Sequence, residues 1–227
     1  MASPVDCLIE TGAKRTFVAA AGWPGWCRSG RDEAAGLEAL WSYRDRYAAV
    51  VEGARVRFPV ARSLSALRVT ERAAGNATTD FGAPDAAFAA DGESIDGREW
   101  SRLRSVLEAC WEAFDRAAIE AEGVELTTGP RGGGRVLGKI VEHVVTSEAS
   151  YLRRLTGAGT ALDERDPWAS RETERAAMRT GLDRAQSGDL PERGPRGGAM
   201  WAPRRFLRRA AWHVLDHAWE IEDRATA

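Results

Sequence analysis

Residues 1–90 alternate between short apolar runs and turn-forming residues, which is typical of a small mixed α/β module. Pro24-Gly25 predicts a turn, and the broken apolar stripe of residues 32–51 predicts a helix. The stretch 75–92 is rich in Gly, Ala and Asp, so it predicts a linker, with 79–84 as a candidate ordered loop inside it. The expected strands lie at residues 7–11, 15–20, 55–58 and 67–71.

From Glu93 onward the hydrophobic period becomes that of helices with one apolar face. Pro203 suits the first turn of the last of these helices, and glycine-rich segments separate them. Four such helices predict a four-helix bundle over residues 93–227. We therefore expect an α+β protein, with a small mixed α/β module at residues 1–90 followed by the bundle. The expected helices cover residues 98–122, 135–156, 167–186 and 203–224.

Composition excludes several classes of protein. The 227 residues are 44% hydrophobic and 29% charged, which is ordinary for a globular protein. A net charge of -2 implies no general attraction to nucleic acid or to an anionic membrane. No apolar run approaches the roughly 20 residues that cross a bilayer, and the first residues lack a secretory signal, so we expect a cytoplasmic protein. The three cysteines are far apart, which argues against a disulfide framework and a thiolate zinc cluster.

The chain has three histidines, and their placement predicts a metal site. His213 and His217 are four residues apart in an expected helix, so their side chains share one face and can hold one ion. His143 lies on the apolar face of the expected helix 135–156, so all three should turn inward. Neutral imidazoles suit zinc first, with nickel or iron as alternatives, and three of them leave coordination positions open. The competing interpretation is three separate buried histidines, each hydrogen-bonded to a carboxylate.

The same histidines carry a resemblance to the DinB-like superfamily. It rests on His143, on the HVLDH pair His213 and His217, and on the ending WEIEDR at 219–224. That family includes thiol S-transferases and a mycothiol-dependent maleylpyruvate isomerase. Its members bind a divalent metal through a histidine of the second helix and an HxxxH pair of the fourth. The resemblance implies a metal-dependent transferase or isomerase that activates a low-molecular-weight thiol, with mycothiol as the suggested one, toward an electrophilic substrate.

A rival hypothesis is that the protein binds the metal but is not an enzyme. In it the bundle is stabilised by the metal, and the N-terminal module mediates assembly or binds a partner protein. The N-terminal module resembles the small ββαβ module of HicB-like antitoxins over about forty residues, in its strand, its Pro24-Gly25 turn with Cys27, and its helix with Glu33-Ala34. That resemblance implies shape and carries over no functional residue. A homodimer is one assembly that stays open.

Further residues near the histidines are candidates for supporting roles, and no catalytic residue is assigned. Arg209 could bind an anionic thiol or carboxylate, with an ion pair inside the bundle as the alternative. Tyr151 shares the face of His143 and is a second candidate for substrate binding. Asp216 and Glu220 could hold the far ring nitrogen of a ligand histidine, and for Asp216 a solvated charge is the alternative. HVLDH lacks the glutamate of the HExxH peptidases, and no GxSxG or phosphate loop is present.

Overall fold

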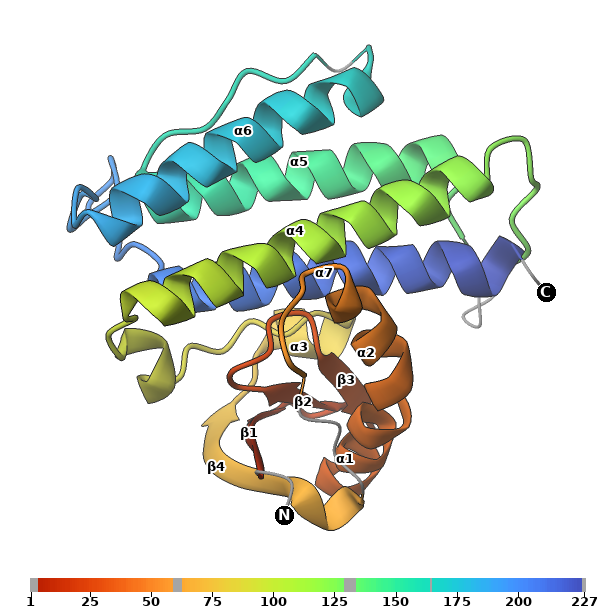
Figure 1. Ribbon diagram of the computed structural model, residues 1–227, viewed down its shortest axis with the longest axis vertical. Helices are drawn as coiled ribbons and strands as arrows, with labels where there is room; N and C mark the ends of the chain where they lie inside the picture. The colour runs from red at the N-terminus through yellow and green to blue at the C-terminus, as the bar shows by residue number, and fades with distance from the viewer. Residues whose placement is uncertain (1–3, 59–62, 129–133, 164, 226–227) are drawn as a thin grey trace. The chain divides into compact units, whose positions relative to one another are not determined.

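The computed structural model describes residues 4–58, 63–128, 134–163 and 165–225, which form an α+β protein (Figure 1). Its strands are β1 (Val5–Thr11), β2 (Thr16–Ala20), β3 (Cys27–Gly30) and β4 (Leu67–Ala74). Its α-helices are α1 (Glu33–Ser42), α2 (Arg44–Glu52), α3 (Ala77–Phe81), α4 (Gly97–Glu120), α5 (Leu137–Thr156), α6 (Pro167–Gln186) and α7 (Pro203–Ala225). Two short 3-10 helices are η1 (Leu64–Ala66) and η2 (Ala89–Gly92). Among the described residues, no helix is both long enough and apolar enough to cross a membrane.

The chain divides into two compact units, which we describe separately. The front unit comprises Met1–Cys110 together with Leu207–Trp212. The helical unit comprises Trp111–Phe206 together with His213–Ala227. The division therefore falls inside α4 and not at the stretch 75–92 that the sequence suggested as a linker.

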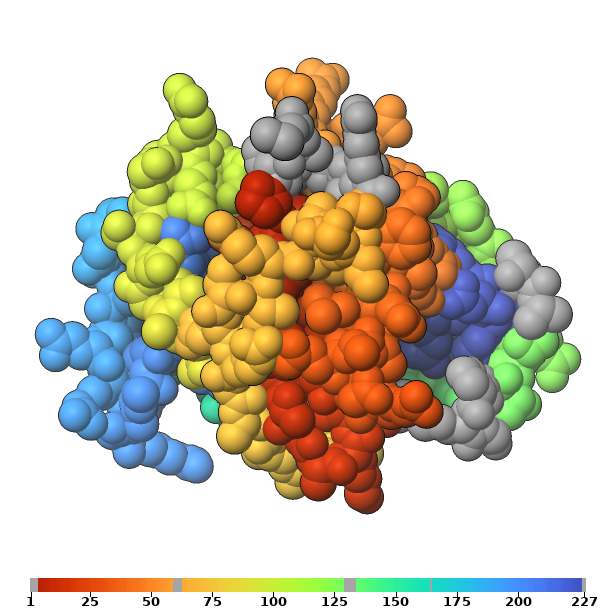
Figure 2. Space-filling view, turned by 90° about the horizontal axis from the view of Figure 1, so that it is seen from below, coloured from red at the N-terminus to blue at the C-terminus, as the bar shows by residue number. Residues whose placement is uncertain are grey.

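The front unit is built on a sheet with the order β3-β2-β1-β4. β2 runs antiparallel to both of its neighbours, whereas β4 is parallel to β1, because α1 and α2 carry the chain across before β4 begins. β2 is buried at every position, while alternate side chains of β4 are exposed, as expected for an edge strand. The light-orange segment that contains β4 is visible at the surface in Figure 2.

Several expectations for the front unit need correction. β3 was not expected, and residues 55–58 form no strand, because the chain turns at Arg55 with a φ of 53°. The single helix expected at 32–51 is two helices, divided at Tyr43. The expected start at Asp32 is right, since its side chain accepts a hydrogen bond from the backbone N–H of Ala35 at 2.9 Å and caps α1.

The stretch 75–92 is an ordered part of the front unit. The carboxylate of Glu10 on β1 is 1% exposed and accepts hydrogen bonds from the Thr79 hydroxyl and from the backbone N–H groups of Asp85 and Ala86. A buried carboxylate needs such partners, since leaving it unpaired would cost several kcal/mol (about 1–3 per lost hydrogen bond). These hydrogen bonds hold residues 75–92 against the sheet, so this segment does not act as a simple linker.

The segment of α7 within the front unit packs through its large side chains. The Trp212 ring meets Phe17 edge-on at 5.9 Å between ring centroids, in a buried cluster with Ala19 and Cys27. Arg208 forms a buried ion pair with Asp91, with 2.7 Å between Nη2 and Oδ2. These contacts explain why residues 207–212 join the front unit although Arg208 and Asp91 are 117 residues apart in sequence.

The helical unit follows the predicted pattern more closely. α5 packs along α6, and the two are seen side by side in Figure 1. Gly181 allows this approach, because a Cβ atom there would lie 2.9 Å from Thr156 Cγ2. α5 ends at Gly157, which has a φ of 80°, and α6 begins at Pro167 under an Asp166 side-chain cap.

Candidate metal centre

The candidate centre is formed by side chains from two helices of the helical unit. His213 and His217 are one turn apart on α7, and His143 reaches them from α5. The neighbours Val144, Val214 and Ala218 are almost wholly buried, so the apolar stripes that bury these helices also turn the imidazoles inward. His213 and His217 are only 5% and 9% exposed.

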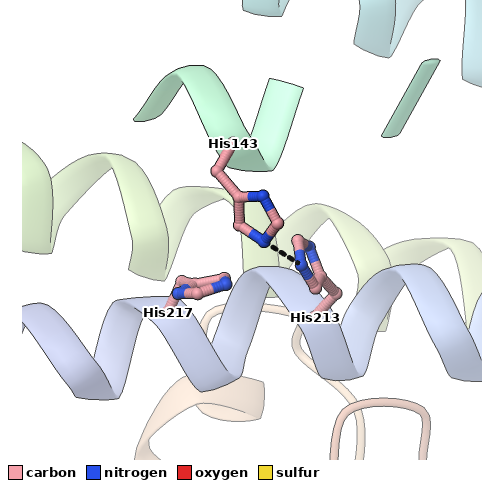
Figure 3. Close-up of side chains that lie close together, drawn as sticks. All are labelled: His143, His213 and His217. Atoms are coloured by element: carbon pink, nitrogen blue, oxygen red, sulfur yellow. Dashed lines mark hydrogen bonds between the residues drawn. The ribbon is translucent and has the colours of Figure 1, made fainter. Parts of the chain in front are cut away.

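The three imidazoles converge on one point (Figure 3). The Nε2 atoms of His143 and His213 are 3.1 Å apart. One ligand atom from each histidine can be chosen so that all three lie within 4.8 Å of one another. Ring-centroid distances of 4.9 Å, 5.0 Å and 4.7 Å show that all three pairs are in contact.

This arrangement fits a single divalent ion. Zinc–imidazole bonds of 2.0–2.1 Å place two nitrogen ligands of a tetrahedral ion roughly 3.3 Å apart. The separation of the His143 and His213 Nε2 atoms is close to that value. Burial is the largest cause that lowers the pKa of His143 to about 4, and the charges of His217 and Arg135 act in the same direction. His143 is therefore neutral at physiological pH, which is the form that binds a metal.

A carboxylate holds one of the rings in place. Glu220 Oε2 accepts a hydrogen bond from His217 Nδ1 at 2.7 Å, which leaves Nε2 of His217 for the centre. Glu220 Oε1 accepts from Arg224 Nη1 at 2.8 Å, and Arg224 Nε donates to the Thr127 carbonyl at 2.7 Å. The hydrogen bond from His217 is the largest cause that lowers the pKa of the Glu220 carboxyl. Arg224 was missed as a candidate, although its spacing of four residues from Glu220 was a signal for it.

Aromatic side chains line one side of the histidines. The Tyr151 ring meets His213 edge-on at 5.6 Å and stacks on Trp201 at 5.6 Å with an interplanar angle of 27°. The guanidinium groups of Arg154 and Arg205 lie over the Trp201 ring at 5.3 Å and 4.8 Å. Trp201 lies just before α7, outside any periodic segment, so no pattern in the sequence marked it as part of this site.

Arg209 and Asp216 were also candidates for supporting roles near the histidines. The Arg209 guanidinium donates to the Pro84 carbonyl and lies 4.9 Å from the centroid of the Trp212 ring, both within the front unit. The proposed role of Arg209 in binding an anionic substrate stays a prediction. Asp216 is half-buried, and its proposed support of a ligand histidine stays a prediction, whereas Glu220 is in place to support His217.

No protein-family model, curated protein or solved structure matches this chain. Fold and site therefore define a class only, that of an α+β protein with a candidate three-histidine metal centre in its helical unit.

Proposed function

We propose that this chain is a metal-dependent enzyme of the DinB-like type, a thiol S-transferase or isomerase whose four long helices form the bundle of that family. The observation that supports the proposal is the convergence of His143, His213 and His217 from two helices. Zinc is the metal that this donor set suits best, with nickel or iron as alternatives.

An enzyme is favoured over a purely structural centre by the number of ligands. Within the described part of the chain, the candidate group consists of the three histidines, with no cysteine or carboxylate as a fourth member. Structural zinc sites are closed by four protein ligands, whereas catalytic sites use three and keep one position for water or substrate. When bound, a divalent cation lowers the pKa of a coordinated thiol enough to deprotonate it, which supplies the nucleophile.

The surrounding residues have separate tasks in this proposal. Glu220, held by Arg224, keeps the His217 ring in the tautomer that presents Nε2. Burial of His213 and His217 keeps these two imidazoles turned toward the centre. The Tyr151 and Trp201 rings would bound the substrate on one side, where flat apolar surfaces suit a carbon electrophile.

The metal is tested first. Protein purified without an affinity tag or chelator should carry about one divalent ion per chain, because three neutral imidazoles form one ligand set. His217→Ala should lose most of this metal. Thr146→Ala is the matched control, because it changes an exposed residue one turn from His143 and should retain the metal. Full metal content in the His217→Ala protein would overturn the site.

The chemistry is tested in cobalt-substituted protein. Adding mycothiol or a simple thiol analogue should produce a sulfur-to-cobalt charge-transfer band, and His143→Ala should abolish it. If the spectrum of protein fully loaded with cobalt stays unchanged when several different thiols are added, the thiol mechanism is refuted. That result would favour the rival, a bundle that the metal merely stabilises.

A further inference from the structure

The helical unit contains a second group of polar side chains that the proposed function does not use. Glu148 on α5 is 0% exposed, and its Oε1 accepts a hydrogen bond from the Trp111 indole N–H at 2.6 Å. The other oxygen, Oε2, is also buried and has no hydrogen-bond partner among the described residues. An ionised carboxylate with one partner is costly in an apolar interior, so this group has reason to hold a proton.

A buried arginine lies close to the tryptophan that binds this carboxyl. Arg175 on α6 is 3% exposed, and its guanidinium lies 5.4 Å from the centroid of the Trp111 ring that binds Glu148. Its Nη1 pairs with Asp115 on α4 at 2.8 Å, whereas Nε and Nη2 are buried without a partner in the described structure. Arg175 therefore has buried N–H groups without a partner in the described structure, and it lies against the same Trp111 side chain that binds Glu148.

We propose that the buried Glu148 carboxyl binds a proton, and that the positive charge of Arg175 limits how tightly the proton is held. This protonation makes the stability of the helical unit depend on pH. The arrangement ties three helices together, because α5 supplies the acid, α4 supplies Trp111 and Asp115, and α6 supplies Arg175. This pH dependence is independent of the proposed metal chemistry, since none of these residues is a histidine of the candidate centre.

The direction of the effect follows from the charges around Glu148. Burial is the largest cause that raises its pKa to about 7, with Glu174 and Asp115 acting the same way, while Arg175 and the Trp111 hydrogen bond oppose it. The folded state thus keeps the proton to a higher pH than the unfolded chain does. The contribution of Glu148 to the stability of the folded state is complete below the ordinary pKa of a glutamate. It is lost as the pH rises through the pKa that Glu148 has in the folded state.

A variant that stays neutral provides the first test. Glu148→Gln can still accept from the Trp111 indole, so it imitates the protonated form at every pH. Between about pH 5 and about pH 8, the unfolding constant of the native sequence should rise roughly 50- to 100-fold relative to that of Glu148→Gln. All other titratable groups are the same in both proteins, so their effects cancel in the ratio. Glu172→Gln, an exposed glutamate of α6, is the matched control and should give a ratio independent of pH.

The second test begins with the native sequence. In full-length protein labelled with nitrogen-15, the indole N–H resonance of Trp111 should shift with pH with a midpoint near neutrality, because its acceptor gains charge there. Arg175→Met should move this midpoint upward, since it removes the balancing positive charge. A Trp111 resonance that stays constant over this pH range, or a stability ratio that does not change with pH, would overturn the proposal.

Discussion

The hydrogen bond from His217 to Glu220 should increase the metal affinity of the centre by about 10- to 100-fold. Its geometry is favourable, with 2.7 Å between Nδ1 and Oε2 and side chains that are 11% and 29% exposed. Carboxylates that orient a ligand histidine usually contribute about 10- to 100-fold to metal affinity, or about 1.4–2.7 kcal/mol. Glu220→Gln retains an acceptor oxygen but loses the charge, so its loss should lie near 10-fold. Glu220→Ala removes the acceptor and should approach 100-fold.

The assay is a competition titration of metal-free protein against a chromogenic chelator, in which the apparent Kd is read directly. Asp223→Asn is the control, because it neutralises an exposed carboxylate on the same helix and should change the Kd little. Equal affinities for the native sequence, Glu220→Gln and Glu220→Ala would show that this carboxylate does not support the centre. A loss in Asp223→Asn as large as that in Glu220→Ala would reduce the effect to general electrostatics.

The remaining predictions concern the front unit. Arg208→Ala should cost roughly 3–5 kcal/mol in chemical denaturation because it leaves Asp91 buried without its partner. Arg68→Ala, at an exposed pair, should change the stability little. Equal costs would show that burial does not strengthen the first pair. The native thiols should resist a thiol-specific reagent at mildly alkaline pH and react once the chain is unfolded, since all are buried and burial raises the pKa of Cys7 to about 12. Rapid native reaction would contradict the packing of Cys7, Cys27 and Cys110.

Local patterns in the sequence determined much of the helical unit. The apolar periodicity predicted α5 and α6 to within about two residues, and it placed all three histidines on inward faces. Such signals are readable because neighbours along a helix share a face, so one segment carries its own evidence. The spacing of His213 and His217 belongs to this kind, and so does that of Glu220 and Arg224.

Contacts between distant segments were decided only by the tertiary structure. The Gly- and Ala-rich residues 75–92 were expected to be a linker, yet the buried Glu10 of β1 orders them. Trp212 and Arg208 belong to α7, yet they pack with Phe17 and Asp91, so part of that helix belongs to the front unit. The approach of His143 to the other two histidines is of the same kind. A sequence pattern reports which face of an element is apolar, whereas the identity of its partner depends on the packing of the whole chain.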